Sequence, residues 1–253
     1  KIYQKEFTIV TLVNDTKCYD EMLKTFQNAG FNPENSEFLY IDNTTSNEGD
    51  GFQGLNNSLS YTSGRYIIFA HQDVRLNFDT IETLRSLIQT MNEIDRNWAV
   101  LGNAGGSENL DEKYIRITDP SGKNQFEGKL PAKVEALDEN FLLLDSTSRV
   151  GFSNDLKGFH FYGLDLCQQA RFRGYSSYVI PFHISHLSSG NKNAVFHESK
   201  RALIENYQRK TKIRFLRLTT TRICLSPSQL LSKFFNYKIA LFILRKTKLY
   251  KIF

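Results

Sequence analysis

The first 75 residues alternate between short apolar runs and amphipathic segments, and this alternation restricts the fold more than any other feature of the chain. Apolar, largely β-branched and aromatic runs of strand length occupy residues 7–13, 38–41 and 65–70. Segments with apolar side chains at helical spacing separate them, at residues 19–28 and 55–62. Strands that alternate with helices form parallel sheets covered by helices on both faces. The sequence therefore predicts an α/β fold with a mainly parallel, doubly wound sheet.

Polar residues follow each of the three predicted strands, at the end where an open parallel sheet binds its ligands. They form three groups, which are Asn14-Asp15, Asp42-Asn43 and His71-Gln72-Asp73. Because the carboxyl ends of parallel strands lie along one edge of a sheet, we expect the three groups to converge there. This edge is the predicted ligand site.

The chain beyond residue 75 continues the alternation less regularly. The remaining predicted elements are helices at residues 80–94 and 165–172 and strands at residues 98–101, 134–144 and 178–184. Asp138 and Glu139 interrupt the second of these strands, and a carboxylate in an apolar strand usually has a purpose. Residues 110–131 are polar and poorly periodic, which predicts a surface excursion. We place the first domain at residues 1–199.

Charge divides the chain near residue 200. Residues 200–253 hold 14 Lys and Arg and one acid, Glu205, for a net charge of +13, whereas the rest of the chain carries −8. Within residues 230–244, apolar side chains such as Phe234 and Phe242 can share one helical face beside basic residues. A basic amphipathic helical extension over residues 200–253 is therefore predicted, with an anionic membrane surface as its partner. Packing on its own domain or on a second subunit is the alternative.

Several classes of protein are disfavoured. Cys18, Cys167 and Cys224 lie far apart without a CxxC pair, which excludes a disulfide scaffold and is typical of a reducing compartment. No segment has the roughly 18 apolar residues that cross a bilayer, and no signal peptide is visible. An acidic body without a recognised motif argues against a nucleic-acid partner. We expect a cytoplasmic protein, peripheral on the inner face of the membrane.

Motifs in a characteristic order resemble the nucleotide-sugar glycosyltransferases of family 2, which have the GT-A fold. They are Asp42-Asn43, Asn56-Asn57, HQDV at residues 71–74, GFHFYGLDLC at residues 158–167 and HLSSG at residues 186–190. The resemblance covers roughly residues 7–190. It implies a metal-dependent, hexosyltransferase-type enzyme that moves a sugar from a nucleoside diphosphate donor, expected to be a UDP-sugar. The implied acceptor is a glycan or lipid-linked glycan in bacterial surface polysaccharide or lipopolysaccharide synthesis.

The same resemblance implies which residues bind the donor and its metal. Asp73 and His186 match the ligands of a divalent ion, Mn²⁺ or Mg²⁺, that neutralises the diphosphate. The residues implied in donor binding are Val13, Asn14, Asp42, Asn43, Asn57, His71, Gln72 and Asp73.

The general base of such an enzyme is missing from its expected place. An inverting transfer needs a group that takes the proton of the acceptor hydroxyl, and the subgroup carries an acid at the position of Gly163. The other candidates are Asp165, His160 and Asp138, although Asp165 can equally cap the helix that follows and His160 can belong to the core. A retaining mechanism and a weakened or inactive nucleotide-sugar or glycan-binding subunit are the alternatives.

Overall fold

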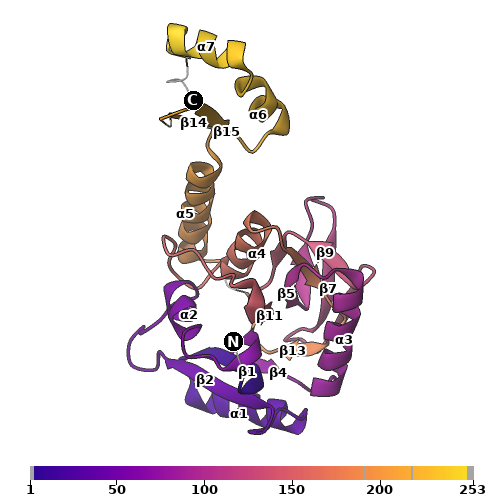
Figure 1. The fold of residues 1–253 in the computed structure, drawn as a ribbon. Coiled ribbons are helices and arrows are strands. Elements are labelled where there is room, and N and C mark those ends of the chain that lie inside the picture. Colours follow the sequence, from indigo (N-terminus) through magenta and orange to yellow (C-terminus); the bar gives the residue numbers. More distant parts are fainter. Residues whose placement is uncertain (1–2, 191, 218, 250–253) are drawn as a thin grey trace. The chain divides into compact units, whose positions relative to one another are not determined.

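The structure is a computed structural model that describes residues 3–190, 192–217 and 219–249 (Figure 1). Its internal contacts divide the chain into two compact units, Lys1–Lys200 and Arg201–Phe253. Each unit has a hydrophobic core of its own. The domain boundaries expected from the charge distribution stay a prediction, because a contact boundary does not show where a functional domain ends.

A mixed sheet forms the centre of the first unit. Among the described residues it has seven strands in the order β2-β1-β3-β11-β5-β12-β9. The strands are β1 (Lys5–Val13), β2 (Ser36–Asp42), β3 (Gly64–Ala70), β5 (Trp98–Gly102), β9 (Ala132–Val134), β11 (Phe141–Asp145) and β12 (Ser176–Val179). β1 pairs in parallel with both β2 and β3, which confirms the predicted arrangement of the first 75 residues. β11 runs antiparallel between β3 and β5, so the sheet is mixed.

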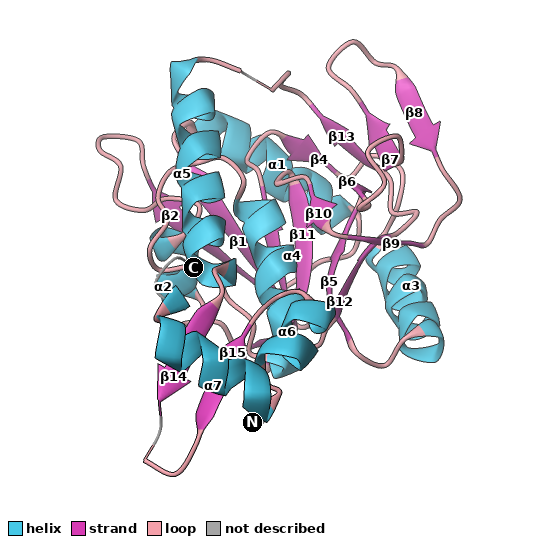
Figure 2. Cartoon of the chain, turned by 90° about the horizontal axis from the view of Figure 1, so that it is seen from above, coloured by secondary structure: helices cyan, strands magenta, loops and turns pink. Residues whose placement is uncertain are grey.

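Helices cover both faces of this sheet (Figure 2). They are α1 (Thr16–Asn28), α2 (Gln53–Ser58), α3 (Ile81–Ile94) and α4 (Tyr162–Phe172), with a short 3-10 helix at Ser146–Ser148. On one face, Phe26 of α1 and Leu84 of α3 belong to the same buried cluster as Ile9 of β1. On the other face, α4 packs on β5 and β12. Both faces are buried, which is why the strands read as continuous apolar runs in the sequence.

A second, smaller sheet lies at the edge of the first unit. Its order is β10 (Ala136–Leu137), β6 (Ala104–Gly106), β7 (Lys113–Thr118), β13 (Ile184–His186) and β4 (Val74–Arg75), and β8 (Asn124–Glu127) pairs with β7. The surface excursion predicted over residues 110–131 contains regular structure, because β7 and β8 form an antiparallel hairpin there. The predicted strand at residues 134–144 is divided, since Asp138 and Glu139 lie between β10 and β11.

The second unit begins within α5 (Ala194–Thr211), because the boundary between the units falls in this helix. It contains the hairpin of β14 (Arg214–Arg217) and β15 (Arg222–Leu225), then α6 (Gln229–Phe235) and α7 (Lys238–Thr247). The single amphipathic helix expected here is two helices, because Asn236 ends α6. Its side-chain amide bonds the backbone N–H and carbonyl of Cys224, each at 2.8 Å. None of the helices in the described ranges is long and apolar enough to cross a bilayer.

Candidate functional site

Asp73 lies where the two sheets meet, and strand pairing brings two histidines to it. β3 ends at Ala70, so His71, Gln72 and Asp73 form the turn into β4. β4 pairs with β13 so that Val74 lies opposite His186. As a result, His186 Nε2 lies 3.3 Å from Asp73 Oδ1, and His71 Nδ1 lies 3.9 Å from the same oxygen. The two expected metal ligands, Asp73 and His186, are adjacent, and His71 joins them.

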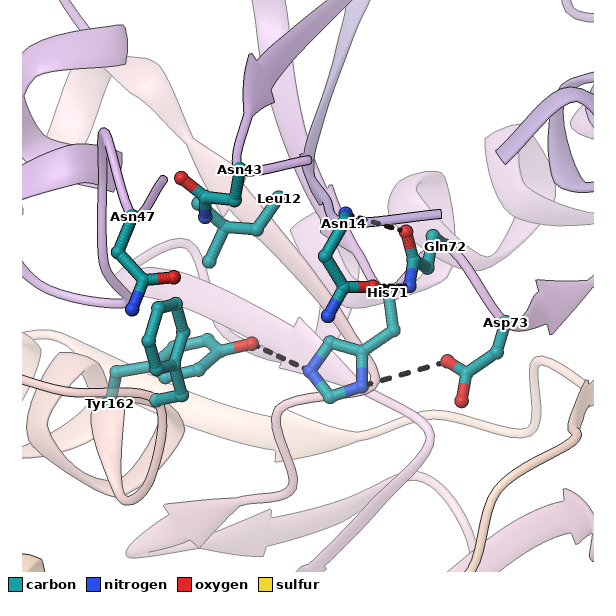
Figure 3. A pocket seen from close by; sticks show the side chains of 9 residues that line it. Leu12, Asn14, Asn43, Asn47, His71, Gln72, Asp73 and Tyr162 are labelled. Atoms are coloured by element: carbon teal, nitrogen blue, oxygen red, sulfur yellow. Dashed lines mark hydrogen bonds and ion pairs between the residues drawn. The ribbon is translucent and has the colours of Figure 1, made fainter. Parts of the chain in front are cut away.

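These three side chains have the geometry of a metal site. Each offers one ligand atom, and the three atoms lie within 4.8 Å of one another. Tyr162 fixes the ring of His71, since its hydroxyl donates to the carbonyl oxygen of Glu139 at 3.3 Å and contacts His71 Nε2 at 2.7 Å (Figure 3). In the tautomer that carries its proton on Nε2, His71 donates to Tyr162 and leaves the lone pair on Nδ1, the atom that faces Asp73.

The charges at the cluster also suit a cation. Burial lowers the pKa of His71 to about 4, so its imidazole is neutral at neutral pH, as a metal ligand must be. For Asp73, burial alone raises the pKa. Hydrogen bonds from His186 and Ser188 outweigh that effect and hold the pKa of Asp73 well below its ordinary value. The cluster thus presents an ionised carboxylate beside a neutral imidazole.

A pocket of about 280 Å³ opens beside the cluster, at the carboxyl ends of β1, β2 and β3 (Figure 3). Its lining residues are Leu12, Asn14, Asn43, Asn47, His71, Gln72, Asp73, Phe159 and Tyr162. Gln72 Oε1 accepts hydrogen bonds from the backbone N–H groups of Asn14 and Asp15, each at 3.0 Å. Asn43 exchanges two hydrogen bonds with the backbone of Gly49, at 2.8 and 3.0 Å. The three polar groups predicted to converge therefore do so.

Three residues expected to bind the donor lie outside this pocket. The side chain of Val13 is fully buried in the core, and Leu12 lines the pocket instead because side chains alternate along a strand. Asp42 is exposed and accepts hydrogen bonds from the hydroxyl and backbone N–H of Thr44, which lower its pKa. Asn57 lies on α2 and lines a different pocket, beside β2.

Two arginines in or next to β3 pair with protein groups, Arg75 beside the site and Arg65 at the opposite end of the strand. Arg75 donates to the carbonyl oxygen of Gln72 at 2.9 Å and pairs with Glu21 at 2.9 Å. Arg65 forms a two-pronged pair with Asp145. These two contacts of Arg75 stabilise the turn that contains Asp73.

A second pocket, of about 660 Å³, adjoins the first and shares His71 and Phe159 with it. Two of the expected catalytic residues, Asp138 and His160, line it together with His186. Asp138 is exposed to solvent in the pocket. The protein atoms around it still desolvate its carboxylate enough to raise the pKa of Asp138. The structure therefore places these two candidates in one pocket with His71 and His186.

Asp165 lies away from both pockets. It is fully buried, and its carboxylate accepts hydrogen bonds from the backbone N–H and hydroxyl of Ser153, at 2.7 and 2.6 Å. The prediction that Asp165 caps a helix was wrong, because α4 begins earlier, at Tyr162, with Phe161 as its N-cap. A general base has to reach an acceptor, so the geometry favours a structural role for Asp165 in holding the segment before α4.

Glu139 was missed in the sequence although it lines the larger pocket. Its carboxylate accepts hydrogen bonds from the backbone N–H groups of Phe161 and Gly163. Burial, and then the negative charge of Asp138, raise the pKa of Glu139 to about 7. The signal that could have identified Glu139 is its place beside Asp138 in an apolar run, where only Asp138 was predicted to be a site residue.

The raised pKa of Glu139 predicts a pH-dependent stability. The folded state holds this proton more tightly than the unfolded chain between pH 4.5 and about 7. Its stabilising effect is complete below pH 4.5 and is lost as the pH rises to about 7. We expect the wild type to lose on the order of 3 kcal/mol of unfolding free energy, relative to Glu139→Gln, as the pH rises across this window. Urea denaturation with EDTA measures it, and a constant difference would contradict the raised pKa.

Solved structures of glycosyltransferases share this architecture. The mannosyltransferase PcManGT from Pyrobaculum calidifontis, solved with GDP-Man and Mn²⁺, superimposes with a TM-score of 0.55 at 11% identity. The alignment covers 82% of this chain and 64% of that one. Residues 1–349 of TarS from S. aureus, solved with UDP, give 0.51 at 12% identity, with coverages of 80% and 65%. The chain thus spans just under two thirds of either structure, and the likeness confirms a GT-A fold.

Sequence comparisons identify the family. The profile described as "Glycosyltransferase like family" matches residues 8–217. A curated protein of Fuscovulum blasticum, "ATP synthase subunits region ORF 6", is 36% identical over 224 residues, which are 87% of this chain and 90% of that protein. Its name describes a genomic region rather than an activity. The chain belongs to the glycosyltransferase-like family, and the resemblance seen in its motifs is confirmed.

Proposed function

We propose that this protein is a metal-dependent glycosyltransferase that moves a hexose from a nucleoside diphosphate, expected to be UDP, to a glycan or lipid-linked glycan. The family supplies the reaction class. The observation that carries the proposal is the cluster of His71, Asp73 and His186 beside a pocket at the strand ends. Bacterial surface polysaccharide or lipopolysaccharide synthesis is the proposed setting.

The donor atoms of the cluster fit a divalent transition metal. When bound, such an ion neutralises the charge that grows on the diphosphate as the sugar leaves. One carboxylate and two imidazoles suit Mn²⁺ better than Mg²⁺, which prefers oxygen ligands and keeps several waters. We therefore propose Mn²⁺, held by Asp73, His71 and His186. Tyr162 would orient the ring of His71, as partners of metal-bound histidines commonly do.

The two adjoining pockets suggest where each substrate binds. The smaller pocket offers the amides of Asn14, Asn43 and Asn47, which can pair with the donors and acceptors of a nucleoside. The larger pocket has room for the acceptor sugar. His71 and Phe159 border both, so the transferred sugar would lie beside them, where the two substrates meet.

A donor panel tests this function. The purified full chain is titrated calorimetrically with UDP-glucose, UDP-GlcNAc, UDP-galactose and GDP-mannose, with Mn²⁺ or with EDTA, and nucleotide release is followed with octyl glycosides as acceptor probes. Mn²⁺-dependent binding and release from one donor supports the proposal. Binding without release, in every combination, supports the alternative of an inactive binding subunit, which Gly163 favours. No binding of any donor contradicts both.

We also propose that the second unit holds the protein on an anionic membrane, which makes it a peripheral protein of the cytoplasmic face. Apolar side chains are exposed on its last two helices, namely Leu230, Leu231, Phe234, Ile239, Phe242 and Ile243. Lys233, Arg245 and Lys246 lie on the same helices. Apolar side chains flanked by cations bind the headgroup region of anionic bilayers.

Removing two of these aromatic side chains should weaken membrane binding. Phe234 and Phe242 are 63% and 55% exposed, and burying each in a bilayer contributes about 1.5–3 kcal/mol. We expect the double variant Phe234→Ser/Phe242→Ser to lower partitioning onto phosphatidylglycerol-containing vesicles at least about tenfold. Co-sedimentation measures it, with Phe126→Ser, 61% exposed in the first unit, as the matched control. Equal binding to neutral phosphatidylcholine vesicles would contradict the preference for an anionic surface, and no binding to either would favour a protein partner or a second subunit.

A further inference from the structure

Position 163 has no room for the acid that the family resemblance places there. A Cβ on Gly163 would lie 2.3 Å from the carbonyl oxygen of Leu137, far inside van der Waals contact. The obstacle is backbone, so a change of rotamer cannot relieve it. The turn between β10 and β11 therefore occupies the space that a side chain at position 163 would need.

The same turn brings a different carboxylate to this place. Glu139 belongs to it, and its carboxylate accepts hydrogen bonds from the backbone N–H groups of Phe161 and Gly163 at the start of α4. Its own carbonyl oxygen accepts from Tyr162, whose hydroxyl also bonds His71. Glu139 thus interacts with Gly163, the position that lacks an acid. Through Tyr162 it is also linked to His71 of the proposed metal site.

Glu139 also lies on the side of the cluster where a base is needed. It lines the larger pocket, proposed to hold the acceptor, which meets the donor pocket at His71 and Phe159. A general base has to lie within hydrogen-bond reach of the acceptor hydroxyl. The backbone N–H groups of Phe161 and Gly163 interact favourably with the carboxylate of Glu139, which lies beside the start of α4.

The other candidates in this pocket are less well placed. The ring of His160 packs edge-on against Phe196, with ring centroids 5.4 Å apart. Asp138 interacts electrostatically with His186, a proposed metal ligand, so a role beside the metal suits it better. Glu139 instead interacts with the start of α4.

We propose that Glu139 is the general base of the transfer and replaces the acid absent at Gly163. This inference rests on the proposed function. The Glu139 carboxylate takes the proton of the acceptor hydroxyl as the hydroxyl oxygen bonds to the anomeric carbon. The bond between that carbon and the diphosphate oxygen breaks, and its electron pair leaves with the nucleoside diphosphate. Attack opposite the leaving group inverts the anomeric configuration.

The variant that tests this role is Glu139→Gln. Glutamine can still accept the two backbone hydrogen bonds but cannot take a proton at neutral pH. We expect nucleotide release to fall about 10²–10⁴-fold, the usual contribution of a general base. Donor affinity and thermal stability should not fall. The assay uses the full chain with Mn²⁺, the nucleotide sugar that binds in the panel and octyl glycosides as acceptor probes. Glu93→Gln, exposed on α3, is the matched control.

Each other outcome overturns the inference in a distinguishable way. Wild-type release by Glu139→Gln would leave the glycosyltransferase function standing without Glu139 as its base. Loss of release in Asp138→Asn, with release retained in Glu139→Gln, would move the base to Asp138. Loss of donor affinity or stability together with the rate would make Glu139 a structural cap of α4. A wild-type chain that neither binds nor cleaves any donor would overturn the proposed function itself.

Discussion

Replacing Asp73 with Asn should lower metal-dependent sugar transfer by at least about 10³-fold, because a bound metal contributes several kcal/mol to the transition state. Asp73 is the one carboxylate in the cluster, and both histidines face it, with His186 at 3.3 Å. The amide has the same shape but no charge, so it cannot balance a cation. Calorimetric titration with Mn²⁺ and the nucleotide-release assay measure the loss.

The control for this variant is Asp111→Asn, which makes the same chemical change at an exposed residue before β7. We expect Asp111→Asn to bind Mn²⁺ and release nucleotide like the wild type. If Asp73→Asn kept its Mn²⁺ affinity and its rate, the metal would lie elsewhere and the cluster would have only a structural role.

Restoring the acid that the family resemblance expects should inactivate the protein rather than improve it. In Gly163→Asp and Gly163→Ala, the new Cβ would meet the carbonyl oxygen of Leu137 at 2.3 Å. Overpacking of this kind costs about 1–3 kcal/mol of stability. The β10–β11 turn would have to move, and Glu139 would lose the geometry that the N–H of Gly163 provides. We expect nucleotide release to fall at least about 100-fold in both variants.

Unfolding in urea and the nucleotide-release assay measure these two effects. Gly106→Ala is a suitable control, because its Cβ would have its nearest neighbour at 3.5 Å, an ordinary contact. A Gly163→Asp chain with wild-type stability and a higher rate would show that the turn yields easily and that position 163 can hold the base.

Local patterns were sufficient for the sheet and for the residues at its strand ends. The run at residues 7–13 and the two that follow it are long, apolar and separated by clear helical segments, and they became β1, β2 and β3. Because parallel strands end on one edge, Asn14, Asn43 and Asp73 could be expected to meet, and they line one pocket. The role of Val13 in donor binding stays a prediction, although alternation along β1 places its side chain in the core and turns Leu12 toward the pocket.

Local patterns were insufficient where two distant segments had to be brought together. The sequence of the β7–β8 hairpin has no strong hydrophobic periodicity, because most of its side chains are partly buried or exposed. The hairpin is stabilised instead by the pairing of β7 with β6 and β13. The break in the basic extension depends on Asn236, whose amide satisfies the backbone of Cys224 twelve residues earlier. Neither contact follows from the spacing of apolar residues along the chain.

The sequence by itself determined the α/β class, the family and the expectation that Asp73 and His186 meet, because these depend on periodicity and on motifs next to strand ends. Only the tertiary structure decided which carboxylates line the larger pocket. Asp165 and Glu139 are both acids near strand or helix ends, yet one is buried against Ser153 and the other lines the larger pocket. The reason is steric and non-local. The turn between β10 and β11 packs directly on Gly163, and a glycine is what allows that approach.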